Sequence, residues 1–371
     1  MIKLAGIGLL AFLLLLLEQR IYRKLWSSNL TVSVHFRKKN ILEGEESELV
    51  EIVENRKKLP ISMLKVKFQT DRNLLFEASE GSKTTDKYYR NDVFQIGGGE
   101  KITRTLIFKG GKRGLYEIRN IDLVAADLFL TEQMFADCVV NTSLFVYPKP
   151  FYSEELRQSL RQLNGEILSK RHLLEDPFEY RGVREYEPYD DMRSINWKAT
   201  AKTGDLKVNQ KNYTALKAVR IFLNLEDSGV WKKSNCVEAS IQIVAGLCEA
   251  FLKEGMQVAC YSNARGKDGS FCLSVEASSG EGQMHAIYRG LALLDEENVL
   301  PCGEAFGDRL SQKGQENFTC FVSPNQYDDW MKMMEEYQEL SEDFVWFYPV
   351  EGMGEPEILA PLRKYARVIH L

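Results

Sequence analysis

Apolar residues follow three successive patterns along this chain. Residues 4–17 form an unbroken apolar run that ends in five leucines. Residues 30–148 alternate apolar and polar positions in short segments separated by turn residues. Residues 151–371 combine apolar positions at helical spacing with short, nearly continuous apolar strands. The patterns predict a membrane helix, an antiparallel β-sheet domain and an α/β domain, in that order.

The N-terminal run predicts a transmembrane anchor over residues 1–26. Residues 1–17 are at the short end of the roughly 17 to 25 residues that a membrane helix needs. The residues expected to lengthen the helix at the membrane interface are Ile21, Tyr22, Leu25 and Trp26. The alternative is a cleaved signal peptide, which requires a small-x-small cleavage site. Because Glu-Gln-Arg follows at residues 18–20, the uncleaved anchor is favoured.

The charges that flank the anchor predict its orientation. Basic residues are concentrated after the helix, and only Lys3 and the amino terminus precede it. By the positive-inside rule, the bulk of the chain is expected in the cytoplasm, with a single pass through the cell membrane. The seven cysteines agree, since their number is odd and most lie in apolar runs, where a reduced cysteine behaves as a small hydrophobic residue.

The alternating region predicts an immunoglobulin-like β-sandwich over residues 30–148. Leu64, Val66 and Phe68 alternate with polar neighbours, as a half-buried strand requires. Glycine-rich turns at 97–99 and 110–114 separate the strands. Pro-Lys-Pro at 148–150 forms a stiff joint and marks the domain boundary.

The remaining residues, 151–371, predict an α/β domain with a mostly parallel sheet. Helical and strand-like segments alternate, which is typical of a sheet covered by helices on both faces. The predicted strands are 218–225, 256–261, 318–322, 344–350 and 366–371, and the predicted helices include the segments around Val244, 284–294 and 327–340.

Composition limits the functions that remain. With 371 residues, 44% hydrophobic and 27% charged, the chain is long enough for two soluble domains. A net charge of -5 provides no general attraction for nucleic acid, so no nucleic-acid partner is expected. Phosphate-binding, dinucleotide-binding and nucleophile-elbow motifs are absent from the sequence, and nothing in it positively indicates an enzyme.

One segment, residues 184–209, follows neither a helical nor a strand period. It resembles the signature of the domain of unknown function 58 family, membrane-tethered bacterial proteins, with Tyr189 at a usual glycine and Asn196 at a usual aspartate. The residues 178–183, 113–116 and 122–129 are also similar to that family. The matched signature residues are Arg184, Glu185, Tyr186, Pro188, Asp190, Arg193, Trp197, Lys198 and Gly204.

The resemblance implies a von Willebrand factor A-like α/β domain. It also implies association with a MoxR-type AAA+ ATPase, in envelope processes or in the maturation of complexes. These are expectations about fold and partner that come from the family.

Two interpretations of the signature segment remain open. In the structural one, Asp190 or Asp191 caps a helix, Trp197 anchors it in the core and Gly204 ends it. This interpretation is favoured, because ion-pair networks also organise domain junctions. In the other, the segment is a partner-binding surface, where Arg and Trp are the usual energetic anchors.

A degenerate metal site is the second candidate feature. In von Willebrand factor A-like domains, an Asp-x-Ser-x-Ser motif after the first strand holds a divalent cation at the carboxyl end of the sheet. Here Asn224, Glu226 and Ser228 occupy those positions, and only Ser228 matches. An amide brings no charge, so no cofactor is expected, with Mg²⁺ at this degenerate site as the alternative.

The sequence thus supports two functional hypotheses. The first is a non-enzymatic, membrane-anchored scaffold or adaptor that docks a protein partner. The second is a metal-dependent hydrolase that uses Glu185, Asp190 and Asp191. Convergence of these three carboxylates in one pocket is the feature that would distinguish them.

Overall fold

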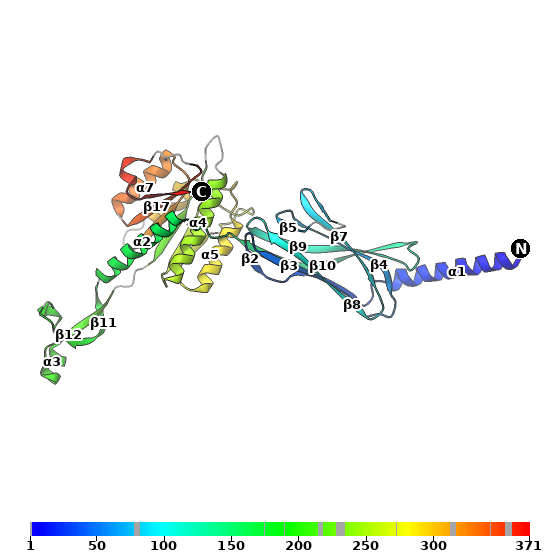
Figure 1. Cartoon of the computed structure of the whole chain (residues 1–371), viewed down its shortest axis with the longest axis horizontal. Helices are drawn as coiled ribbons and strands as arrows, with labels where there is room; N and C mark the ends of the chain where they lie inside the picture. The colour runs from blue at the N-terminus through cyan, green and yellow to red at the C-terminus, as the bar shows by residue number, and fades with distance from the viewer. Residues whose placement is uncertain are drawn as a thin grey trace. The chain divides into compact units, whose positions relative to one another are not determined.

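The computed structural model of the chain divides into two compact units, Met1–Lys149 and Pro150–Leu371 (Figure 1). The division falls within the Pro-Lys-Pro joint. Tyr189 and Ser228, which were singled out in the sequence, lie outside the described residues. Those described are 2–77, 82–173, 175–188, 190–213, 218–227, 234–271, 273–311, 317–341, 343–352 and 358–371.

The first unit is a β-sandwich preceded by one helix. Its sheets have the strand orders β1-β3-β8-β5 and β2-β10-β9-β4-β7-β6, and every neighbouring pair is antiparallel except β10 with β2. This confirms the predicted antiparallel sandwich. The elements are α1 (Ile2–Leu25), β1 (Leu30–Phe36), β2 (Asn40–Leu42), β3 (Glu46–Asn55), β4 (Ile61–Asp71), β5 (Leu74–Phe76), β6 (Ser82–Thr84), β7 (Lys87–Ile96), β8 (Glu100–Gly110), β9 (Gly114–Ala126) and β10 (Gln133–Tyr147).

The sandwich core follows directly from the alternation of the sequence. Side chains with a period of two lie on one face of each strand, so Leu49 of β3 and Leu64 of β4 are fully buried between the sheets. Each such apolar side chain contributes about 1.5 to 3 kcal/mol of burial free energy.

Helix α1 ends inside this core. Tyr22 and Trp26 are only 3% and 5% exposed and belong to the same hydrophobic cluster as the sheets. The Tyr22 hydroxyl donates to the carbonyl oxygen of Pro60 at 3.0 Å. The expectation that these two residues lie at a lipid interface was therefore wrong, because they contact protein.

The second unit contains a six-stranded sheet of order β15-β14-β13-β16-β17-β18. All neighbouring strands are parallel except β14 and β15, which confirms a mostly parallel sheet. The predicted elements are present, with small shifts at their ends. The elements are α2 (Glu154–Leu173), β11 (Glu175–Glu185), η1 (Met192–Ser194), α3 (Trp197–Thr203), β12 (Lys207–Tyr213), β13 (Val219–Leu223), α4 (Ser234–Lys253), β14 (Val258–Ser262), β15 (Ser274–Ser278), α5 (Glu281–Leu293), α6 (Cys302–Leu310), β16 (Phe318–Val322), α7 (Asp328–Leu340), β17 (Phe344–Val350), η2 (Ala360–Leu362) and β18 (Ala366–His370).

Helices cover both faces of this sheet. Phe222 of β13 and Phe321 of β16 pack with α6 and α7 in one aromatic cluster, while α4 and α5 pack together, side by side in Figure 1. Among the described residues, α4 is the helix whose length and apolarity would allow it to span a membrane, but 67% of that stretch is buried inside the unit. Helix α4 is therefore a core helix of this unit.

A buried ionic cluster joins the two sheets of the sandwich. Asp92 accepts hydrogen bonds from Arg90 and, at 2.6 Å, from Nη1 of Arg104. Glu51, which is fully buried, lies opposite Arg104 in the register of β3 and β8. Burial, and then the negative charge of Asp92, raise the pKa of Glu51 to about 8 against the smaller individual effects of Arg90 and Arg104, which lower it.

We expect Glu51→Gln to stabilise the sandwich at pH 8 by about 2 kcal/mol and to change it little at pH 5. The folded chain holds this proton more tightly than the unfolded chain, so wild-type stability falls as the pH rises from the ordinary glutamate pKa toward 8. Urea unfolding at both pH values measures the difference. The matched control is Glu46→Gln, an exposed position on the same strand; equal pH profiles for the wild type and Glu51→Gln would contradict the assignment.

Candidate functional site

The signature residues form one small antiparallel module. Strands β11 and β12 pair so that Glu185 is opposite Lys207 and Val183 is opposite Asn209, and η1 and α3 lie in the connection between them. We call residues 182–188 and 190–213 the signature module. The hairpin brings the two ends of the sequence signature together, which the sequence alone did not indicate.

An ion pair closes the module. Arg184 donates to both carboxylate oxygens of Asp190, at 2.7 and 2.5 Å, and to the carbonyl oxygen of Glu185 at 2.8 Å. The backbone N–H of Glu187 also donates to Asp190, at 2.8 Å. These hydrogen bonds, that from Arg184 first, lower the pKa of Asp190. Asp190 is therefore an ionised structural acceptor and is a poor proton donor at neutral pH.

The helical part of the module consists of two short helices. Asp191 caps η1 by accepting from the N–H of Arg193, and Asn196 caps α3 by accepting from the N–H of Ala199 at 2.9 Å. The prediction of a single helix capped by Asp190 or Asp191 was wrong in this respect. Asn196 also donates to Oδ1 of Asn209 at 2.6 Å, a bond that an ionised aspartate lacks the hydrogen to make.

Gly204 ends helix α3, as predicted. Its φ of 80° lies in the left-handed region, where a residue with a side chain is strained, and its N–H donates to the carbonyl oxygen of Thr200 at 2.9 Å. The N–H of Lys207 then donates to Oγ1 of Thr200 at 3.0 Å, so the chain returns directly into β12.

The small core of the module excludes Trp197. Ile195 and Val208 are 6% and 3% exposed and face each other across an isolated bridge, whereas Trp197 is 66% exposed. The prediction that Trp197 is a core anchor was therefore wrong: Ile195 fills that place. Met192 is 69% exposed, and Pro188, Arg193 and Lys198 are exposed as well, while Tyr186 is half-buried.

The three carboxylates proposed for hydrolysis serve separate local interactions. Glu185 pairs with Lys207 at 3.0 Å, Asp190 binds Arg184, and Asp191 caps η1. Across the described parts of the chain, no group of three or more His, Cys, Asp or Glu residues is arranged to hold a metal ion. The geometry therefore does not bring these carboxylates together around one reacting group.

The second candidate region lies where the strand order of the large sheet reverses, at the carboxyl ends of β13, β14 and β16. Asn224, fully buried, accepts from the N–H of Glu226 at 3.0 Å and from Nδ2 of Asn263 at 2.7 Å. Asn263 also accepts from the N–H of Leu225 at 2.9 Å. Sequence reasoning missed Asn263, although it follows a predicted strand at the same sheet edge.

These donors do not fit a divalent cation. The carbonyl oxygen of Asn224 already accepts two hydrogen bonds, which occupy both of its lone pairs. Glu226 accepts from the N–H of Cys302 at 3.2 Å. Burial, and then the negative charge of Glu226, raise the pKa of Cys302 to about 11. The side-chain oxygens of Asn224 and Glu226 thus accept hydrogen bonds from neighbouring groups, whereas the buried Nδ2 of Asn224 has no partner among the described residues.

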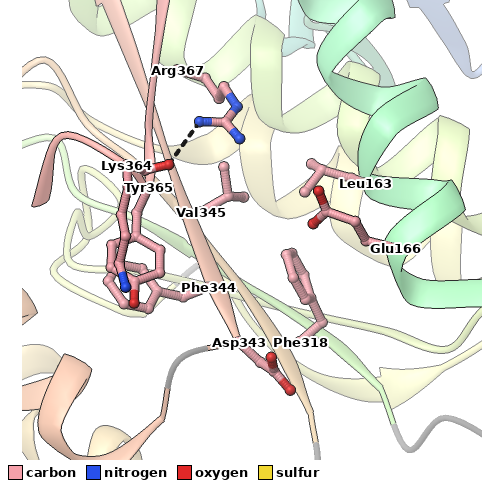
Figure 2. Close-up of a pocket in the computed structure, with 9 residues that line it drawn as sticks. All are labelled: Leu163, Glu166, Phe318, Asp343, Phe344, Val345, Lys364, Tyr365 and Arg367. Carbon is pink, nitrogen blue, oxygen red and sulfur yellow. Dashed lines mark hydrogen bonds between the residues drawn. The ribbon is translucent and has the colours of Figure 1, made fainter. Parts of the chain in front are cut away.

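A cleft of about 260 Å³ lies between α2 and the amino ends of the strands, at the edge opposite Asn224 (Figure 2). The rings of Phe344 and Tyr365 stack along the wall of the cleft, with their centroids 4.1 Å apart. Arg367 donates a hydrogen bond to the carbonyl oxygen of Lys364 at 2.9 Å. None of the predicted site residues lines it. The lining residues are Leu163, Glu166, Phe318, Asp343, Phe344, Val345, Lys364, Tyr365 and Arg367.

No family model and no curated protein matches the chain. Similar solved structures include a chain of a type I cohesin–dockerin complex from Clostridium thermocellum, at 12% identity and a TM-score of 0.24, covering 31% of this chain and 99% of that chain. Another is a non-cellulosomal cohesin from the archaeon Archaeoglobus fulgidus, at 10% identity and a TM-score of 0.22, covering 35% and 97%.

A third is Spo0M, a sporulation control protein from Bacillus subtilis, at 12% identity and a TM-score of 0.18, covering 43% of this chain and 58% of that chain. All three likenesses are distant.

We expect Asn224→Ala to lower the free energy of unfolding by about 2 to 4 kcal/mol, because it leaves the buried donors of Glu226 and Asn263 unpaired. Urea unfolding measures the loss. Asn235→Ala, at an exposed position on α4, is the control and should cost less than about 0.5 kcal/mol. Calorimetry with Mg²⁺ on the wild type should give no saturable heat; a heat that Asn224→Ala removes would restore the metal hypothesis.

Proposed function

We propose that this chain is a non-enzymatic, membrane-anchored adaptor that docks a protein partner through its signature module. The observation that carries the proposal is the exposure of Trp197, 66%, on a module that two ion pairs, Arg184–Asp190 and Glu185–Lys207, hold together. The family resemblance makes a MoxR-type AAA+ ATPase the expected partner.

The exposed side chains of the module have the chemistry of an interface centre. Trp, Met and Arg are enriched where protein partners meet, and Trp and Arg are common energetic anchors. Trp197 and Met192 provide apolar area and Arg193 provides a cation. Because Ile195 and Val208 already form the module's core, the exposed Trp197 is not needed for folding and is available to a partner.

The proposal includes a von Willebrand factor A-like fold for the α/β domain and an immunoglobulin-like fold for the sandwich. In the large sheet the first strand along the chain, β13, is central, and the edge strand β15 is antiparallel to β14. That order is compatible with the von Willebrand factor A-like domain that the resemblance implies, and the sandwich is compatible with an immunoglobulin-like one.

Helix α1 supports the membrane anchor. Its apolar side chains lie on all sides and lack protein cover, which in water would be strongly unfavourable. Arg20 and Lys24 follow the apolar part and favour a cytoplasmic location for the two units. The exposed apolar residues of this part are Ile7, Leu9, Leu10, Phe12, Leu13, Leu14, Leu16 and Leu17, between 46% and 67% exposed.

We expect Trp197→Ala to weaken binding of the MoxR-type ATPase from the same organism by at least about 30-fold, the effect of a 2 kcal/mol anchor. Biolayer interferometry with the detergent-purified full chain measures the dissociation constant. The unfolding midpoint should stay unchanged, because the side chain is exposed.

Phe135→Ala is the matched control for this experiment, since Phe135 is an equally exposed aromatic residue, 71%, on β10 of the other unit. It should bind the ATPase like the wild type. Equal affinity of Trp197→Ala and the wild type would refute docking through this module.

We also expect deletion of residues 2–17 to move the chain from the alkali-resistant membrane pellet into the soluble fraction. The deletion removes the apolar run but keeps Tyr22 and Trp26, so the sandwich core stays complete. Carbonate extraction followed by immunoblotting is the measurement. A full-length chain that alkali releases would contradict the anchor.

A further inference from the structure

The turn between β9 and β10 presents an apolar tip. Leu128, Phe129 and Leu130 follow one another there and are 48%, 58% and 58% exposed. We call residues 127–132 the apolar turn. Three consecutive exposed apolar side chains are unusual in a turn, where polar residues and glycine normally predominate.

The shape of the apolar turn is held by Asp127 and does not depend on the exposed side chains. Asp127 is fully buried and accepts from the N–H of Thr131 at 2.6 Å, from the N–H of Glu132 at 3.1 Å and from the Thr131 hydroxyl. The N–H of Leu130 closes the turn by donating to the carbonyl oxygen of Asp127 at 3.2 Å. The apolar tip therefore stands on a rigid base.

Leu130 shows that the tip is not optimised for folding. Its φ of 61° lies in the left-handed region, which glycine or asparagine adopts more easily than leucine. A strained residue would usually be compensated by burial of its side chain, but this one is exposed. Burial of the Leu130 side chain against a surface outside the protein would offset this backbone strain.

Hydrogen bonds tie the apolar turn to the residues that directly follow the apolar run of α1. The N–H of Leu128 donates to Glu18 at 2.8 Å, Gln19 donates to the Thr131 hydroxyl at 3.0 Å, and Arg23 pairs with Glu132 at 2.5 Å. The turn is therefore level with the point at which α1 stops being apolar.

The length of the apolar run places that point at a membrane surface. At 1.5 Å per residue, residues 2–17 span about 24 Å, which is less than the roughly 30 Å of a bilayer's hydrocarbon core. The shortfall draws the residues after Leu17 toward the interface. Arg20 and Lys24, both exposed, suit the phosphate-rich headgroup layer there.

We propose that Leu128, Phe129 and Leu130 insert into the interface of the same bilayer that α1 crosses. This second contact holds the sandwich at a fixed orientation on the membrane, because the turn and the end of α1 belong to one compact unit. The inference rests on the membrane anchor of the proposed function. The apolar turn is expected to contact lipid, because it lies level with the end of the apolar run of α1.

Photo-crosslinking of the full chain tests the insertion. The variant Phe129→p-benzoylphenylalanine is reconstituted in vesicles of phosphatidylcholine and phosphatidylglycerol, illuminated, and analysed for lipid adducts by mass spectrometry. The matched control is Leu75→p-benzoylphenylalanine, since Leu75 is 53% exposed on β5 and pairs with the end of β8 opposite the end at which α1 enters. We expect at least fivefold more lipid adduct at position 129 than at position 75.

The outcomes separate this inference from the anchor. Equal lipid adducts at both positions in a chain that resists alkaline extraction would show that α1 alone contacts the membrane, and the insertion would be rejected. An adduct between two copies of the chain in place of lipid would also reject it. Release of the chain by alkali would reject the anchor, and the insertion with it.

Discussion

Polar side chains with little access to solvent are stabilised by hydrogen bonds inside the protein, and such bonds organise three distinctive regions of this chain. Asp190 is held by Arg184, Asn224 by Asn263, and Asp127 by the backbone of its own turn. An unpaired group at any of these positions would cost about 1 to 3 kcal/mol. The Arg184–Asp190 pair and the Asp127 turn are local in the sequence, whereas the Asn224–Asn263 contact joins segments that are 39 residues apart.

The same constraint explains why apolar side chains are left on the surface. In the signature module, the ion pair and the caps determine the backbone path, and Ile195 fills the small core. Trp197 is then directed outward. In the apolar turn, Asp127 fixes the backbone and Phe129 is exposed. Both surfaces offer apolar groups on a preorganised base, which lowers the entropic cost of binding a partner or a membrane.

The degenerate sheet edge shows how one substitution changes a site. A carboxylate at position 224 would have spare lone pairs for a cation, whereas the Asn224 amide is bound on its oxygen by two donors. The edge that commonly binds ligands in open α/β sheets is here closed by an amide network. The exposed side chains of the signature module are therefore better suited to bind a partner than the polar groups of the sheet edge.

Periodicity in the sequence was enough to predict the helix at the N-terminus, the antiparallel sandwich and the mostly parallel sheet, because burial of one face imposes a regular spacing on apolar residues. Gly204 was also predictable, since its conformation is a local property of the backbone. The exposure of Trp197, the burial of Tyr22 and Trp26, and the meeting of Asn224 with Asn263 were not predictable in this way. Those features depend on which distant segments pack together, and only the tertiary structure decides that, because side-chain chemistry alone does not specify whether a tryptophan meets the core, the solvent or a membrane.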